Sequence, residues 1–195
     1  RKGLSVNDVL FLVSENDIVV DLGANVGSVS EEFLKNGCEV YAYEPHPIAF
    51  EKLQNNLSTY KKVHIFNNAV LNKKDKMKLY FHRDHKDNEV EYSTSASLMT
   101  DKRDISHSDF AEVDVLDIKD ILRAIKGRVK ILKIDIEGAE YDVLDHIIEN
   151  HLYKDIDYIF VETHHHKIDN LTDRHEKIVR DIRDNDIDNI YLGWV

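Results

Sequence analysis

The stretch that decides the fold runs from residue 17 to residue 27 and reads DIVVDLGANVG. Its first part, Asp17–Leu22, is a short run rich in β-branched side chains that stops at a glycine, which is typical of a strand buried in a parallel sheet. Gly23–Gly27 follows as a turn, and Ser28–Asn36 carries apolar residues at helical spacing up to Gly37, where a helix ends. Strand, glycine turn and helix in this order predict the first unit of an α/β fold.

The same alternation continues along the chain. Further strands are expected at Glu39–Tyr43, Val63–Phe66, Val113–Leu116, Val129–Ile134, Tyr158–Val161 and Ile190–Val195. Helices are expected from the prolines at 45 and 47 to Leu57 and over Ile118–Ile125, Ala139–Asn150 and Arg174–Asp184. Strands that alternate with helices predict a doubly wound, mostly parallel sheet in a single domain spanning residues 1–195, with its ligands beyond the carboxyl ends of the strands.

One segment, residues 71–111, interrupts this alternation after the third strand. Met77–Phe81 resembles one arm of a hairpin, whereas Ser93–Ser97 has neither a helical nor a strand period. Long irregular segments in compact domains commonly carry function. We therefore expect an insertion that lies over the carboxyl ends of the strands and acts as a substrate lid.

Composition excludes several classes of protein. The 195 residues include 26 Lys and Arg against 37 Asp and Glu, a net charge of −11, which disfavours binding to nucleic-acid phosphates. The single cysteine, Cys38, excludes an intrachain disulfide and a multi-thiolate metal site. The longest apolar run, Val9–Val13, is far shorter than the roughly 20 residues that span a bilayer. These features predict a cytoplasmic protein without nucleic-acid partners and without a membrane span.

Polar residues follow the first three expected strands and indicate a nucleoside pocket. Gly23 and Gly27 frame a G-x-N-x-G turn, which differs from the G-x-G-x-x-G turn of dinucleotide-binding proteins. Asp21 precedes that turn, where a carboxylate repels a pyrophosphate and attracts a cation. Glu44 ends the next strand, a position suited to a ribose diol, and Asn68 follows the third, where an amide can meet adenine. An adenosine joined to a cation, as in S-adenosylmethionine, fits this pattern better than NAD does.

A second group of candidates follows the two strands beyond the insertion. The block KIDIEGAE at residues 133–140 places Asp135 and Glu137 after an apolar strand, and the later strand leads into Glu162 and His164. Unpaired carboxylates are costly to bury, so these are expected to face a ligand, a cation or water. Histidine titrates near neutrality and is a natural general base. A metal held by Asp135, Glu162 and His164 is the less favoured interpretation, because adjacent histidines on a strand alternate between faces, and no metal is predicted.

Taken together, these motifs resemble the FkbM family of S-adenosylmethionine-dependent methyltransferases. The resemblance covers about residues 17–164, and its most specific part is the KIDIEGAE block; the matching stretches are VDLGANVG (20–27), YEP (43–45), NAV (68–70), SASL (95–98), KIDIEGAE and VETH (161–164). It implies a class I, Rossmann-like methyltransferase that O-methylates a hydroxyl of a sugar, glycan or small metabolite. Family members often end in a two-strand hairpin, whereas a single strand-like run follows the last helix here, so a shortened hairpin is expected.

The roles that follow are hypotheses. Asp21, Gly23, Asn25 and Gly27 are expected to hold the methionine end of the cofactor, with Glu44 on the ribose and Asn68 on the adenine. Asp135 is assigned both to the cofactor and to catalysis. His164 is expected to remove the proton, with Asp135, Glu137 and Glu162 orienting the base or the acceptor. Three alternatives remain open: an RNA 2′-O-methyltransferase, a NAD-dependent oxidoreductase and a non-catalytic subunit with a methyltransferase fold.

Overall fold

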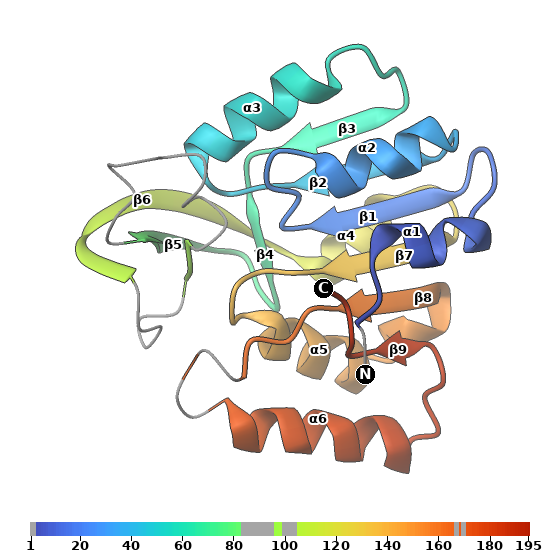
Figure 1. The fold of residues 1–195 in the computed structure, drawn as a ribbon. Helices are drawn as coiled ribbons and strands as arrows, with labels where there is room; N and C mark the ends of the chain where they lie inside the picture. The colour runs from blue at the N-terminus through green and yellow to red at the C-terminus, as the bar shows by residue number, and fades with distance from the viewer. Residues whose placement is uncertain (1–2, 83–95, 99–104, 166–167, 169–170) are drawn as a thin grey trace.

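Six strands form the central sheet of the protein, in the order β3-β2-β1-β7-β8-β9, and every neighbouring pair is parallel. The computed structural model describes residues 3–82, 96–98, 105–165, 168 and 171–195 (Figure 1). The strands of this sheet are β1 (Ile18–Leu22), β2 (Glu39–Tyr43), β3 (Val63–Phe66), β7 (Val129–Ile134), β8 (Ile156–Val161) and β9 (Ile190–Tyr191). Because the chain moves outward from β1 to β3 and then returns to β7, the strand order reverses between β1 and β7, which is the usual ligand site of such sheets.

Helices cover both faces of the sheet. The helices are α1 (Val6–Val9), α2 (Ser28–Lys35), α3 (Pro47–Leu57), α4 (Ile118–Ala124), α5 (Glu140–Glu149) and α6 (Thr172–Asp184), with short 3-10 turns at Leu10–Leu12 and Leu152–Asp155. Apolar residues of α1, α2 and α3 pack with Val19, Val40 and Ile131 of the sheet. Apolar residues of α4, α5 and α6 pack on the opposite face of the sheet, against Val20 of β1 and Leu132 of β7, which alternate along their strands with Val19 and Ile131. Side chains on a strand alternate between faces, so β1 and β7, which are covered on both sides, are mostly apolar, with Asp21 and Lys133 as buried charged exceptions.

A second, smaller sheet stands beside the carboxyl ends of the parallel strands (Figure 1). It has the order β4-β6-β5 and consists of β4 (Ala69–Leu71), β5 (Asp75–His82) and β6 (Ile105–Asp117). β5 and β6 pair antiparallel from Asp75↔Val115 to His82↔Ile105, and β4 pairs parallel with the far end of β6. The residues after β3 therefore leave the main sheet and lead into this appended layer.

The predicted architecture is confirmed: the sheet is doubly wound and parallel, with an insertion after the third strand. The largest differences from the expectation concern three strands. The strand expected at Val113–Leu116 is the end of the much longer β6, because its hairpin pairing with β5 extends it. Ala69–Leu71 is a separate strand of the small sheet. The expected last strand, Ile190–Val195, pairs with β8 only at Ile190 and Tyr191, although Trp194 still donates its backbone N–H to the Val161 carbonyl.

No helix among the described residues is long and apolar enough to cross a bilayer. Within the stretch Ser93–Ser97, predicted to have no regular period, Ser93–Ser95 lie outside the described residues, whereas Ala96 and Ser97 are described and buried.

Candidate active site

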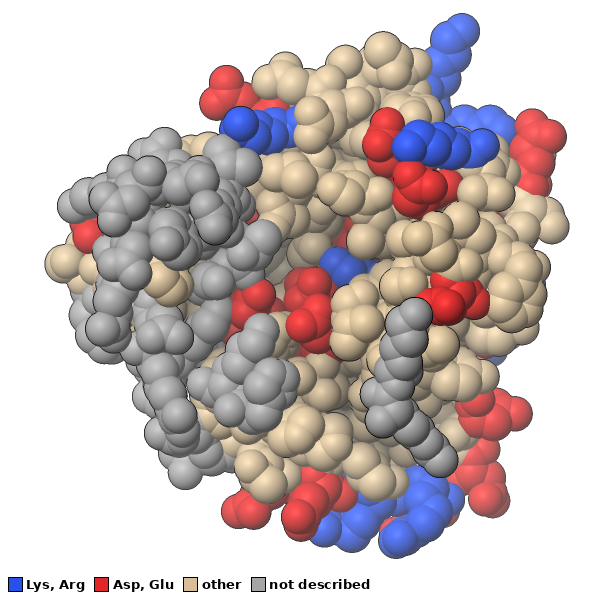
Figure 2. Space-filling view, in the orientation of Figure 1, with Lys and Arg blue, Asp and Glu red and all other residues tan. Residues whose placement is uncertain are grey.

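A pocket opens at the carboxyl ends of β1, β2 and β7, where the strand order predicts a ligand site. Its empty space amounts to about 700 Å³, part of which is open solvent. Six of the residues singled out in the sequence line it: Gly23, Asn25, Glu44, Asn68, Asp135 and Glu137. On the face of the molecule drawn in Figure 2, acidic side chains gather in a central hollow, with a basic side chain beside them. The structure thus brings residues from four separate segments of the chain to one cavity.

The backbone of Gly23 explains why a glycine must follow β1. Gly23 has φ of +78°, and a Cβ atom at this position would lie 1.7 Å from the carbonyl oxygen of Asp135. Heavy atoms cannot approach so closely, so a side chain here would push apart the ends of β1 and β7. The glycine turn is therefore required by strand-to-strand packing as well as by any ligand.

Glu44 lies at the end of β2 and is almost completely buried. One carboxylate oxygen accepts the backbone N–H of Asn25 at 2.8 Å, and the other accepts that of His46 at 2.7 Å. Burial raises the pKa of Glu44 to about 7, although these two N–H groups oppose the rise. A carboxylate oxygen has two lone pairs, so both oxygens retain acceptor capacity toward the pocket that Glu44 lines.

The two asparagines at the pocket are held by backbone contacts. Asn25 has a left-handed backbone with φ of 49°, which aims its N–H at Glu44. Asn68 donates its side-chain amide to the Asp114 carbonyl on β6 at 3.3 Å. The amide of Asn68 is thereby anchored to the small sheet at the wall of the pocket.

Asp21 lies beneath the glycine turn and outside the pocket lining, with no exposed surface. One oxygen accepts the hydroxyl of Ser30 on α2 at 2.7 Å, and the other lies 3.1 Å from the ammonium of Lys133 on β7. The sequence indicated that this carboxylate attracts a cation, and in the fold the nearest cation is that lysine. Direct contact of Asp21 with a cofactor stays a prediction. Gly27, which has φ of +94° and precedes α2, is also outside the lining.

His164 follows β8 and is completely buried among carboxylates. Its Nδ1 lies 2.9 Å from Oε1 of Glu140, while its Nε2 lies 3.5 Å from Glu137, 3.5 Å from Glu162 and 3.9 Å from Asp135. Burial opposes a charge on the imidazole, but the hydrogen bond to Glu140 and the neighbouring carboxylates outweigh it and raise the pKa of His164. The four predicted catalytic residues therefore meet in one cluster, which shares Asp135 and Glu137 with the pocket.

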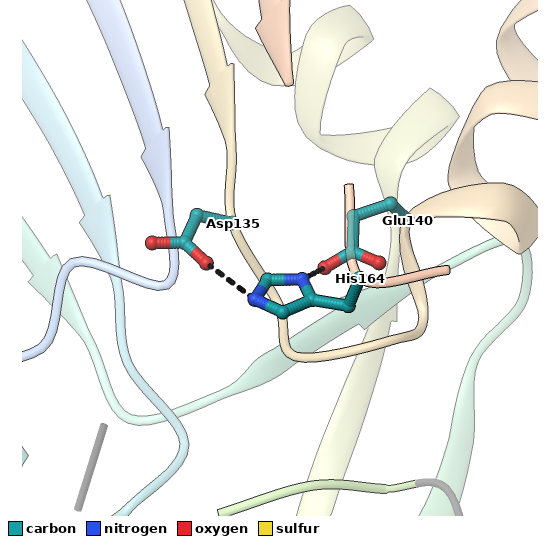
Figure 3. Close-up of side chains that lie close together, drawn as sticks. All are labelled: Asp135, Glu140 and His164. Atoms are coloured by element: carbon teal, nitrogen blue, oxygen red, sulfur yellow. Dashed lines mark hydrogen bonds and ion pairs between the residues drawn. The ribbon is translucent and has the colours of Figure 1, made fainter. Parts of the chain in front are cut away.

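Glu140, the first residue of α5, organises this cluster and was not among the predicted site residues. Besides His164, it accepts the backbone N–H groups of Ile136 and Gly138 at 3.0–3.1 Å. Asp135 and Glu140 approach opposite nitrogens of the imidazole (Figure 3). Ligand atoms of these three residues lie within 4.8 Å of one another, but the flanking arrangement is that of a carboxylate orienting a histidine rather than three ligands around a common centre.

Sequence reasoning also missed Lys133 and Ser97. A lysine inside the apolar run Val129–Ile134 was the available signal for Lys133, because a buried ammonium needs a partner. Ser97 donates its hydroxyl to the Glu137 carbonyl at 2.7 Å, and its neighbours Ala96 and Leu98 line the pocket. No sequence period marks that contact, because it joins residues 40 positions apart.

Comparisons with known proteins give a family match and a similar fold. The chain matches the family described as "Methyltransferase FkbM domain" over residues 21–186. No curated protein sequence matches the chain. Among solved structures, a precorrin 8w decarboxylase from Methanobacterium thermoautotrophicum is 17% identical, with a TM-score of 0.50 over 94% of this chain and 71% of that one.

Two further solved structures are similar at lower scores. The precorrin-6y C5,15-methyltransferase of Geobacter metallireducens is 12% identical, with a TM-score of 0.46 over 92% of this chain and 68% of that one. A putative methyltransferase from an antibiotic biosynthesis pathway of Anabaena variabilis is 24% identical, with a TM-score of 0.29 over 33% of this chain and 25% of that one.

The family match spans the glycine turn, Glu44 and the KIDIEGAE block, which contribute to the pocket, and His164 in the adjoining cluster. The fold of the central sheet agrees with it. The chain therefore belongs to the FkbM family of S-adenosylmethionine-dependent methyltransferases.

Proposed function

We propose that the protein transfers a methyl group from S-adenosylmethionine to a hydroxyl group of a sugar, glycan or small metabolite. The observation that carries this proposal is the junction of two features: the pocket at the switch point of the sheet and the cluster around His164, which share Asp135 and Glu137. A methyl donor in the pocket and an acceptor at the cluster would then meet at these two carboxylates.

The charges of the pocket fit a cationic cofactor. Its described lining residues include Glu44, Asp135 and Glu137 but neither lysine nor arginine. The nearby Lys133 is engaged by Asp21 and Asp135, so it does not neutralise the lining as a whole. Sulfonium and ammonium groups favour such a carboxylate-lined cavity, whereas a pyrophosphate is repelled by it. This is why NAD is the poorer candidate.

The residues that would hold the cofactor follow from their places on the wall. The Glu44 carboxylate would accept hydrogen bonds from the ribose hydroxyls, and Asn68 would contact the adenine. The backbone of the turn at Gly23 and Asn25 would hold the methionine end with Asp135. When bound, the cofactor supplies an electrophilic methyl group, and the protein supplies alignment and proton removal.

Proton removal is assigned to His164. Glu140 fixes the ring by accepting a hydrogen bond from Nδ1, which directs Nε2 toward the carboxylates that border the pocket. A base and an orienting carboxylate in hydrogen-bond contact is the geometry that general-base catalysis requires. Because the pKa of His164 is raised, its neutral, basic form becomes populated only as the pH rises through that value.

Described residues of the insertion form part of the pocket wall. Leu79 of β5, Ala96 and Leu98 line the pocket, and Ser97 ties this segment to the Glu137 carbonyl. We propose that the insertion at 71–111 covers the acceptor and excludes water during transfer. An RNA acceptor gains no support from the net charge of −11, since many phosphate contacts require an excess of cations.

A transfer assay tests the proposal directly. The protein is incubated with methyl-labelled S-adenosylmethionine and a panel of free sugars, glycans, sugar nucleotides, hydroxylated metabolites and a short RNA. Labelled product from a hydroxylated small molecule or glycan is the expected result. Mass spectrometry of this product should place the labelled methyl group on an oxygen atom, as a methyl ether. Labelling of RNA alone, or of a carbon or nitrogen atom, would contradict the proposal.

A further inference from the structure

Lys133 is a buried lysine in the middle layer of the fold, and the mechanism above does not use it. It lies on β7 opposite Asp21 of β1, its Cα partner in the parallel pairing. Its side chain is 3% exposed, and that of Asp21 is 0% exposed. Lysine is almost never fully buried unless it is paired, so its place in this strand calls for a specific reason.

The ammonium of Lys133 does more than neutralise Asp21. It donates to the carbonyl oxygen of Gly23 at 2.8 Å, and it lies 3.1 Å from Oδ1 of Asp21 and 3.5 Å from Oδ2 of Asp135. These acceptors belong to the glycine turn, to β1 and to the residue that follows β7. Gly23 and Asp135 line the pocket, whereas Asp21 does not.

The two contacts at the pocket wall have a mechanical consequence. The Gly23 turn and the Asp135 backbone are already packed so closely that no Cβ fits between them. Lys133 ties the carbonyl of one to the carboxylate of the other from beneath. Without the ammonium, the buried Asp21 carboxylate, the Gly23 carbonyl oxygen and the partly exposed Asp135 carboxylate would lie close together with no cation between them, and their mutual repulsion would displace them.

We propose that Lys133 is a positioning residue for cofactor binding: its ammonium holds the Gly23 carbonyl and the Asp135 carboxylate in the pocket wall. This inference rests on the proposed function, because it takes the pocket to be the cofactor site. The alternative is that Lys133 is purely structural and serves only to balance the charge of Asp21.

The test measures binding of S-adenosylhomocysteine by calorimetry and the free energy of unfolding by urea, for matched variants. Lys133→Met removes the ammonium and keeps an apolar stem of similar length. Lys130→Met is the control, because Lys130 lies on the same strand and pairs with Asp157 at 2.9 Å, away from the pocket. We expect the affinity of Lys133→Met to fall by about tenfold or more and that of Lys130→Met to stay within about twofold.

A second pair of variants separates positioning from charge balance and covers the case in which Lys133→Met does not fold. Asp21→Asn is compared with Asp21→Asn/Lys133→Met, in which the buried pair is replaced by two neutral side chains. If Lys133 positions the wall, adding Lys133→Met to Asp21→Asn weakens binding by a further factor of about ten. If Lys133 only balances Asp21, these two variants bind alike, and the inference is overturned.

The unaltered protein gives an independent measurement. Addition of S-adenosylhomocysteine should shift the ¹⁵N resonance of the Lys133 ammonium, whereas an unmoved signal in a saturated complex would count against the inference. If the unaltered protein binds no S-adenosylhomocysteine at all, the proposed cofactor site fails instead, so the two failures are distinguishable.

Discussion

Nδ1 of His164 lies 2.9 Å from Oε1 of Glu140, and both side chains are completely buried. Glu140 begins α5, while His164 follows β8, so this contact joins the two segments that carry the predicted catalytic residues. Glu140 also accepts two backbone N–H groups of the turn before α5. The Glu140 carboxylate therefore holds both the imidazole of His164 and the backbone of the turn before α5.

Replacing His164 tests its role as the base. In His164→Gln we expect kcat to fall by about 10²-fold or more, because proton removal is lost, while the affinity for S-adenosylhomocysteine stays within about twofold. His64→Gln is a matched control: His64 also contacts a glutamate, Glu39, at 2.9 Å, but on an exposed part of β3. Full turnover by His164→Gln would leave alignment alone as the source of catalysis.

The pH profile of the unaltered enzyme gives a sharper test. Because the pKa of His164 is raised above its ordinary value of 6.5, kcat should increase with pH along an acidic limb centred above 6.5. The limb should be absent from any residual activity of His164→Gln. A rate that is already flat at pH 6 would instead indicate a carboxylate base, since ordinary carboxyl groups are ionised there.

The same shift predicts a pH dependence of stability. A group whose pKa is higher in the folded than in the unfolded protein stabilises the fold below its unfolded pKa, and this contribution is lost as the pH rises through the folded pKa. The contribution of His164 to the free energy of unfolding should therefore become smaller as the pH rises above about 6.5. Urea unfolding of the unaltered protein and of His164→Gln at several pH values measures it; parallel curves would contradict the assignment.

Glu44 should make cofactor binding depend on pH near neutrality. Burial raises the pKa of Glu44 to about 7, and a ribose and a cationic cofactor favour its ionised form. Affinity for S-adenosylmethionine should therefore rise as the pH increases through 7, with proton release on binding below that value. Calorimetry in two buffers of different ionisation enthalpy detects the proton. Glu44→Gln should abolish this dependence, whereas Glu39→Gln, at the other end of β2, should retain it.

Gly23 should not tolerate a side chain. Gly23→Ala places a Cβ atom 1.7 Å from the Asp135 carbonyl oxygen on a backbone with φ of +78°. The expected loss is about 2 kcal/mol or more in the free energy of unfolding, with cofactor binding weakened as the turn shifts. Gly193→Ala is the control, since a Cβ there meets no atom within 4 Å. Equal stability of the two variants would show that the turn can relax.

Much of this arrangement was predictable from the sequence. The run from Asp17 to Leu22, the glycine turn and the alternation of strands with helices determined a parallel, doubly wound sheet, because each pattern is local and its period fixes the element. Parallel strands bring their carboxyl ends to one edge. That rule alone placed Glu44, Asn68 and Asp135 together, and the structure shows all three at the pocket.

Tertiary structure decided which partner each of these residues meets. Asp21 contacts Lys133 through strand register, Glu140 reaches His164 across 24 residues, and Ser97 reaches Glu137 across 40. The length of β6 and the second sheet likewise depend on pairing with a distant strand. A sequence period records only which face of an element is buried, whereas the charge state of a buried group depends on the atoms that the whole fold brings within a few ångströms of it.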